Sequence, residues 1–315
     1  MSASDNKLDG TLPPTASVNA SLSELLPPLP VPKRSWASWL SGVISIILLI
    51  AIILQLRKFG FARALEILPT SPYFWMAFAA YYVVLPTSEW MIYRRLWRIP
   101  FDGFAALLRK LISNDLLLGY SGEAYFYIWA RRRMNLVAAP FGAVKDVSIL
   151  SALAGNLMTL IMLVIAYPLV GSLGNNFNFD PQDIIKSAGF IILLSMSFFI
   201  FRKRIFSLPR GDLNFVFAMH VVRLLVALGL SVTLWHTGMP GVPIVLLVML
   251  ATLQLLVTRL PFVTNKEIVF AALAGLIVAD DARAVIGLIA TAILATHLFV
   301  GMILVMAELL SVRRT

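Results

Sequence analysis

The sequence contains no cysteine and has few charged residues. Lys, Arg, Asp and Glu together make up 13% of its 315 residues, about half of the roughly 25% that is usual for a soluble globular protein. Hydrophobic residues make up 59%. This balance excludes a soluble enzyme, a disordered chain and a fibrous protein. The lack of cysteine excludes disulfides, thiolate metal sites and cysteine nucleophiles, and it removes any redox indication of the compartment.

Motifs of ATP-driven and metal-dependent proteins are missing as well. The chain has no Gly-x-x-x-x-Gly-Lys-Ser/Thr loop, and its three histidines, at 220, 236 and 297, lack the four-residue spacing of a helical metal pair. Asp280 and Asp281 stand at the end of a predicted span, which suits a turn or a helix cap better than an intramembrane aspartyl enzyme. We therefore predict no cofactor, no metal and no enzymatic activity.

The apolar residues are gathered into blocks that are long enough to cross a bilayer. A hydrocarbon core of about 30 Å takes about 20 residues as a helix. Seven blocks are predicted spans, namely residues 40–54, 71–90, 149–170, 184–201, 213–235, 242–257 and 284–310. Residues 116–130 and 268–279 are shorter, as re-entrant or buried segments usually are. The sequence therefore predicts an all-α, polytopic integral membrane bundle of about seven to nine passes, including two short re-entrant helices.

The N-terminal segment differs in composition from the rest of the chain. Residues 1–35 are rich in Ser, Pro, Asn and Leu, which is typical of a disordered tail with a stiff polyproline-like end. They are too long and too polar for the n-region of a signal peptide. We predict a disordered, proline-rich cytoplasmic tail over residues 1–35 and a transmembrane domain over residues 36–315.

The formal net charge of +10 would suit a nucleic-acid partner in a soluble domain. Here the basic residues lie in short clusters between apolar blocks, and membrane orientation and anionic lipid explain them better. We therefore predict no nucleic-acid partner. The positive-inside rule places both termini in the cytoplasm. One basic cluster disagrees with this orientation, because Arg57, Lys58 and Arg63 lie between the first two predicted spans and would face outward. Either the rule is broken there or this segment is an interfacial helix.

Between the second and third spans lies an amphipathic stretch that is followed by two glycines. Arg109 and Lys110 stand beside leucine and isoleucine residues, a pattern typical of a helix at the headgroup level or of a cytoplasmic connector helix. Gly119 and Gly122 then allow a break in the helix. Lipid tolerates such a break only where protein or water satisfies the exposed backbone, so we expect this segment to face the interior.

Two ionisable residues are predicted at membrane depth. Glu123 directly follows the helix break, and Arg223 lies near the middle of a span, three residues after His220 on the same helical face. Charged groups at this depth are costly and are functional candidates by default. The alternatives are an interfacial Glu123 paired with a nearby arginine, and an Arg223 that snorkels to the cytoplasmic surface.

Two short patterns carry a resemblance to a known family. The first consists of Asn114, Leu117, Leu118, Gly122 and Glu123, followed by an apolar helix and the cluster Arg131, Arg132 and Arg133. The second consists of Arg259-Leu260-Pro261-Phe262 and then Asn265-Lys266-Glu267. Together they resemble the two signatures of the lysylphosphatidylglycerol synthase transmembrane (flippase-like) family, the first of which is Asn-x-x-(Leu)-Pro-x-x-x-Gly-Glu followed by basic residues.

The resemblance covers the chain from about residue 40 to its C-terminus. It implies a bundle whose broken helices enter from opposite sides, and a cavity that takes lipid headgroups across a bacterial cytoplasmic (inner) membrane. It also implies no aminoacyl transfer, because in bifunctional members a separate soluble domain performs that chemistry. The chain ends at Thr315, and we expect no room for such a domain.

Broken helices in corresponding halves of a chain also point to a midplane binding site in transport folds, independently of the family. The predicted substrate-binding set has seven members: Asn114, Glu123, Arg131, Arg223, Arg259, Lys266 and Glu267. An arginine can grip a phosphate in a bidentate way, whereas a lysine acts as a point charge. The arginine cluster that begins at Arg131 has the alternative role of a cytoplasmic anchor.

Other polar residues in apolar blocks are predicted to hold helices together. Asn156, Gln254 and His297 lie in such blocks, where an interhelical hydrogen bond of about 0.6 kcal/mol is the common use. Proton coupling through His220 or His297 is an alternative, because imidazole titrates near neutral pH.

Two classes of function follow from these features. The first is a flippase-like transporter of an anionic phospholipid or a lipid-linked precursor. The second is a non-catalytic scaffold or accessory subunit, whose partners are envelope-biosynthesis membrane proteins. A membrane transferase that uses a polyprenyl-linked donor is a more distant third. Transport is favoured if four charged residues converge with the two broken helices on one lipid-accessible cavity: Glu123, Arg223, Arg259 and Glu267. Separate pairing of these residues with neighbouring helices favours the scaffold.

Overall fold

The computed structural model describes residues 69–116, 121–133, 140–170, 189, 206–260 and 265–312. Over these residues the chain forms eight helices and no strand: α4 (Pro72–Trp97), α5 (Asp102–Leu116), α6 (Ser121–Arg133), α7 (Pro140–Val170), α10 (Arg210–Gly238), α11 (Ile244–Arg259), α12 (Lys266–Ala274) and α13 (Asp280–Val312). The predicted tail, the predicted span 40–54, the basic cluster 57–63 and, apart from residue 189, the predicted span 184–201 lie outside the described residues.

Three of these helices are long and apolar enough to cross a membrane. They cover Phe141–Leu169, Arg210–Gly238 and Asp280–Leu304, and α11 is a shorter apolar helix. Five of the predicted spans are helical, in α4, α7, α10, α11 and α13; of these, α4 and α11 are not among the three helices with the length and apolarity of a span. The all-helical architecture predicted from the sequence is confirmed for the described residues, and it fits a helical membrane protein.

Proline stands at the start of four helices, where its missing N–H costs nothing and its fixed φ suits the first turn. Pro72 and Pro140 are the first residues of α4 and α7, and Pro209 and Pro243 directly precede α10 and α11. The first turn of α13 contains Asp280 and Asp281, where carboxylates complement the helix dipole. This position fits the capping role that the sequence predicts for them.

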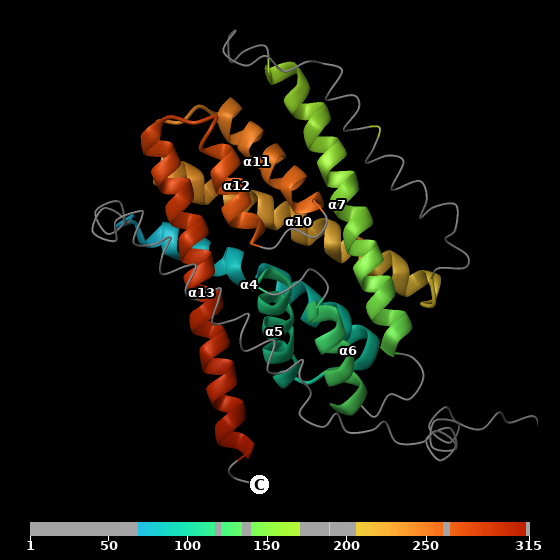
Figure 1. Cartoon of the computed structure of the whole chain (residues 1–315). Coiled ribbons are helices and arrows are strands. Elements are labelled where there is room, and N and C mark those ends of the chain that lie inside the picture. Colours follow the sequence, from blue (N-terminus) through green and yellow to red (C-terminus); the bar gives the residue numbers. More distant parts are fainter. Residues whose placement is uncertain are drawn as a thin grey trace, which may run out of the picture.

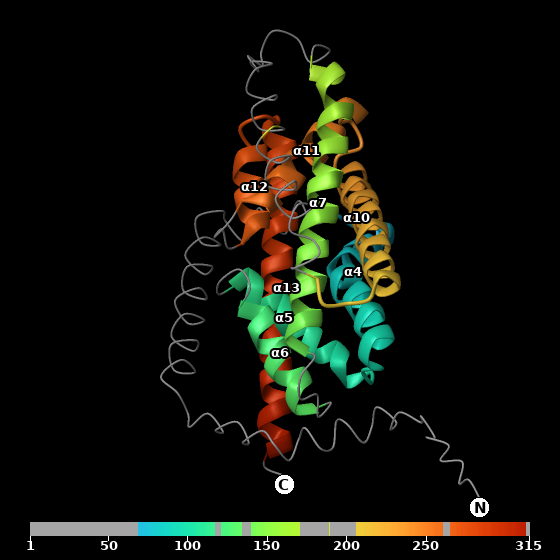
Figure 2. The ribbon, with the colours of Figure 1, turned by 90° about the vertical axis from the view of Figure 1, so that its right-hand side faces the viewer.

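The short helices lie at opposite ends of the bundle. In Figure 1, α13 and α7 lie on opposite sides and α10 runs between them. In both views, α5 and α6 lie toward the C-terminus of the chain, whereas α11 and α12 lie toward the other end (Figures 1 and 2). One apolar core joins α4, α10, α11, α12 and α13, and a second joins α4, α5, α6, α7 and α10.

The end of α5 and the residue before α12 meet inside this bundle. In sequence, α5 is followed by α6, and α11 is followed by α12. The backbone N–H of Asn265, which precedes α12, donates a 3.0 Å hydrogen bond to the carbonyl of Asp115 near the end of α5. Asn265 has a left-handed backbone, with φ of 50°, a conformation that asparagine tolerates better than most residues. The helix ends that the sequence singles out are therefore neighbours.

Candidate functional site

A cavity of about 320 Å³ lies where Asp115 of α5 meets Asn265, and both residues line it. Its walls come from α4, α5, α7, α10, α11, α12 and α13, with the loop before α12. The polar and charged residues that line it are Tyr81, Tyr82, Asp115, Ser151, Arg223, Ser231, Gln254, Thr258, Arg259, Asn265, Lys266, Glu267 and His297. Four of the seven residues predicted for the site are among them: Arg223, Arg259, Lys266 and Glu267.

Three cationic side chains reach this cavity from three different helices. Arg223 on α10 donates from Nη2 to the hydroxyl of Ser151 over 3.2 Å, and its Nε is buried without a hydrogen-bond partner among the described residues. Lys266 on α12 donates from Nζ to the carbonyl of Thr258 over 2.7 Å. Within the described part of the chain, neither side chain forms an ion pair with a carboxylate. Both positive charges are therefore met by neutral oxygens.

Arg259 is the third cation, at the end of α11. Its Nη1 donates to the carbonyl of Ala152 over 3.3 Å, and its Nε and Nη2 contact the hydroxyl of Thr258. These contacts join α11 to α7. Because the carbonyl of Thr258 also binds Lys266, the two cations share one anchoring residue.

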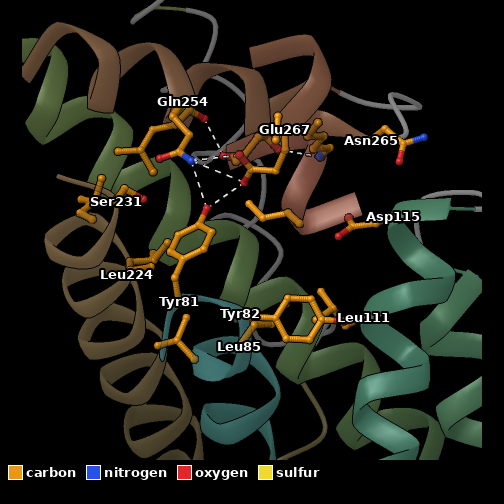
Figure 3. A pocket seen from close by; sticks show the side chains of 18 of the residues that line it. Tyr81, Tyr82, Leu85, Leu111, Asp115, Leu224, Ser231, Gln254, Asn265 and Glu267 are labelled. Carbon is orange, nitrogen blue, oxygen red and sulfur yellow. Dashed lines mark hydrogen bonds between the residues drawn. The ribbon is translucent and has the colours of Figure 1, made fainter. Parts of the chain in front are cut away.

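Glu267 is the centre of a hydrogen-bonded group on the wall of the cavity. The hydroxyl of Tyr81 donates to its Oε1 over 2.8 Å. The amide of Gln254 donates to its Oε2 over 3.3 Å and contacts the Tyr81 hydroxyl at 3.0 Å. Figure 3 shows the three side chains pointing toward one another from α4, α11 and α12. Gln254 thus makes the interhelical contact predicted for it, with a carboxylate as its partner.

Asp115 is the second carboxylate of the cavity. Its Oδ2 lies 2.9 Å from Nε2 of His297 on α13, and the hydroxyl of Tyr82 on α4 lies 3.0 Å from Nδ1 of the same ring. The His297 side chain is buried, whereas that of Asp115 is 34% exposed. Three helices therefore meet through one imidazole, and both ring nitrogens are engaged.

Three predicted site residues lie outside this cavity. The side chain of Asn114 accepts a 2.8 Å hydrogen bond from the N–H of Gly122. The Asn114 side chain thereby caps the start of α6. Arg131, on α6, is partly exposed. Glu123 lies 3.4 Å from Nζ of Lys110, which also contacts Glu89. The structure thus separates these residues from the four that converge on the cavity.

Glu89, Lys110 and Glu123 form a charged cluster between α4, α5 and α6, in which Glu89 and Lys110 are buried and Glu123 is partly buried. The side chains of Lys110 and Glu89 are 4% and 7% exposed. The helix that carries Lys110, α5, packs against α4, α6 and α13, and its position relative to the membrane stays a prediction. Glu123 faces the interior, as predicted, but its partner is a lysine and not one of the nearby arginines.

Four residues that line the cavity are not predicted from the sequence: Tyr81, Tyr82, Asp115 and Ser151. Aromatic and hydroxyl side chains in an apolar span are most often packing residues, and Asp115 follows an amphipathic stretch. One signal was present in the sequence. A histidine in the middle of an apolar block, such as His297, needs a polar partner, and Asp115 stands next to the predicted helix break.

The comparisons with known proteins give no relative for this chain. No family model matches it, and neither does a curated protein or a solved structure. The resemblance to the lysylphosphatidylglycerol synthase transmembrane family therefore rests on the sequence patterns alone and stays a prediction.

Proposed function

We propose that this protein is an integral membrane, lipid-handling protein that acts as a flippase-like transporter of an anionic phospholipid or a lipid-linked precursor. The observation that carries the proposal is the convergence of Arg223, Arg259 and Lys266, from three helices, on one cavity where the end of α5 meets the residue before α12. Of the four charged residues that the transport hypothesis expects to converge, Arg223, Arg259 and Glu267 line this cavity, whereas Glu123 pairs with Lys110 outside it. The proposal involves no catalytic step.

The charges of the cavity favour an anionic group. The two carboxylates among its described lining residues already have donors of their own, since Glu267 accepts from Tyr81 and Gln254, and Asp115 contacts His297. The cations at 223 and 266 have only neutral acceptors among the described residues. A phosphate would supply the missing negative charge, and a hydrogen bond to a charged group contributes about 1.5–3 kcal/mol. The start of α12 at Lys266 adds the positive end of a helix dipole.

The arrangement of the short helices suits passage of a headgroup. In this proposal α5–α6 and α11–α12 are re-entrant pairs that enter from opposite faces of a bacterial cytoplasmic membrane, and both termini lie in the cytoplasm. Irregular backbone at membrane depth is stable only where protein or a water-filled cavity satisfies it. The contact between Asp115 and Asn265 supports this reading, because it joins the end of α5 to the residue before α12 beside the polar cavity.

The test is transfer of fluorescent lipids between the leaflets of proteoliposomes. Phosphatidylglycerol and phosphatidylcholine carrying the same acyl-linked fluorophore are compared for the wild type, Arg223→Gln and Lys266→Gln. We expect selective transfer of phosphatidylglycerol that falls about tenfold or more in each variant, since about 1.4 kcal/mol is a factor of ten.

Arg95→Gln is the matched control. Arg95 forms an exposed ion pair with Asp212 at the surface, and we expect this variant to transfer lipid like the wild type. If the wild type moves neither lipid faster than empty liposomes do, the transport proposal fails. The scaffold hypothesis would then be favoured, and the separate pairing of Glu123 with Lys110 is what that hypothesis expects.

A further inference from the structure

Both ring nitrogens of His297 have hydrogen-bond partners that can stay in place when the ring gains a proton. A neutral ring accepts a hydrogen bond from the Tyr82 hydroxyl at Nδ1 and donates from Nε2 to the carboxylate of Asp115. A protonated ring donates at both nitrogens, and the Tyr82 hydroxyl hydrogen turns away from Nδ1. The distances of 3.0 Å and 2.9 Å serve both states. Histidine is the side chain that exchanges a proton near neutral pH.

The surroundings of His297 favour this residue over His220. His297 has a carboxylate at hydrogen-bond distance, which stabilises an added positive charge, and that carboxylate is partly exposed and offers a path for the proton. His220 is completely buried, and no carboxylate of the described residues lies within ion-pair distance of it. Tyr82 and Asp115 both line the cavity, as Figure 3 shows.

The charge state of His297 is linked to that of the whole cavity. The ionisable groups that line it with His297 come from α4, α5, α10, α11 and α12, and they are Tyr81, Tyr82, Asp115, Arg223, Arg259, Lys266 and Glu267. A further positive charge is unfavourable beside three cations while the cavity is empty. An anionic headgroup removes that penalty. Binding of the headgroup therefore favours binding of the proton, and thermodynamic linkage requires the reverse effect to be equal.

We propose that His297 is a proton-binding site and that the protein moves one proton together with each anionic headgroup. This inference rests on the proposed function and adds the energy source of transport. The proton comes from the aqueous phase on one side, is held on the imidazole between Tyr82 and Asp115, and leaves on the other side with the lipid. A singly charged headgroup and one proton cross as a neutral pair.

The experiment measures the steady-state distribution of fluorescent phosphatidylglycerol between the leaflets of proteoliposomes that hold a gradient of one pH unit. For one proton per lipid, the probe accumulates about tenfold in the leaflet on the alkaline side. Because the pair is neutral, a membrane potential without a pH gradient leaves the distribution even. In His297→Gln, whose amide keeps a donor and an acceptor, the probe spreads evenly whatever the gradient.

His236→Gln is the control, because His236 is exposed at the end of α10, and it keeps the tenfold accumulation. If a variant does not fold, the wild type alone still decides whether a proton moves with the lipid. An even distribution in the wild type, or accumulation on the acid side, overturns the coupling and leaves the transport proposal standing. A wild type that transfers no lipid overturns both. Accumulation that persists in folded His297→Gln removes this residue as the proton site.

Discussion

The guanidinium of Arg259 lies against the backbone of Gly155. A methyl group built on Gly155 would lie 2.1 Å from Nη1 of Arg259 and 2.5 Å from its Cζ. Atoms cannot approach so closely, so only glycine at this position of α7 leaves room for the guanidinium where it stands. Gly155 therefore helps to set where the cation lies in the cavity, although it has no polar side chain of its own.

Gly155→Ala should separate function from stability. The end of an arginine side chain can move, so we expect the free energy of unfolding to change by less than about 1 kcal/mol. Displacement breaks the Nη1 contact with the Ala152 carbonyl. Transfer of phosphatidylglycerol should fall about tenfold, because the displaced guanidinium no longer reaches the phosphate, and one hydrogen bond to a charged group contributes about this much. Thermal unfolding in nanodiscs and the transfer assay measure the two effects.

The control for Gly155→Ala is Gly229→Ala, because a methyl group at Gly229 in α10 meets nothing within 4 Å. Both the unfolding temperature and the transfer rate should stay at the wild-type level or rise slightly, since alanine favours helix over glycine. Equal transfer by both alanine variants would show that the position of the Arg259 guanidinium does not matter.

Gly122→Ala should act on stability instead. A methyl group at Gly122 would lie 2.1 Å from the backbone carbonyl oxygen of Lys110, and a backbone atom cannot move aside alone. The pair α5–α6 must then separate, which we expect to cost about 1–3 kcal/mol, as overpacking usually does. Thermal unfolding in nanodiscs gives the measurement. A wild-type unfolding temperature would contradict the close approach of α6 to α5.

Much of the helical framework could be predicted from the sequence because it depends on local signals. Apolar blocks locate α7, α10 and α13. The sequence predicts a helix break at Gly122, whereas in the structure Gly122 lies in the first turn of α6 and lets that helix approach α5. The partners of buried charges were not visible. Asp115 and His297 are 182 positions apart, and only the packing of α5 against α13 brings them together. Lys110 looked like a surface residue because its helix is amphipathic.

Asn114 provides a test of a predicted binding residue that the structure gives a capping role. Its side-chain oxygen accepts from the N–H of Gly122, and loss of a cap of this kind costs about 1 kcal/mol. Asn114→Ala should lower the unfolding temperature, whereas Asn114→Asp keeps the acceptor and should unfold like the wild type. Transfer rates, corrected for folded protein, should match the wild type in both. A specific loss of transfer in Asn114→Asp would return this residue to the binding set.

The charged cluster of Glu89, Lys110 and Glu123 gives the largest expected effect on stability. Two carboxylates share one lysine there, and Oε2 of Glu123 has no hydrogen-bond partner among the described residues. Lys110→Met leaves the buried Glu89 and the partly buried Glu123 without a cation. Removing one partner from a buried ion pair costs about 3–5 kcal/mol. We expect a large fall in the unfolding temperature in nanodiscs.

Two further variants decide whether charge is the cause of that fall. Replacing both carboxylates together with the lysine, as Glu89→Gln, Lys110→Met and Glu123→Gln in one chain, removes every charge of the cluster and should recover much of the lost stability. Arg133→Met breaks the exposed pair with Asp102, and surface pairs contribute about 0–1 kcal/mol, so its unfolding temperature should barely change. If the triple variant is no more stable than Lys110→Met alone, uncompensated charge is not the cause of the fall. The packing of the lysine stem, which Lys110→Met removes, then holds these three helices together.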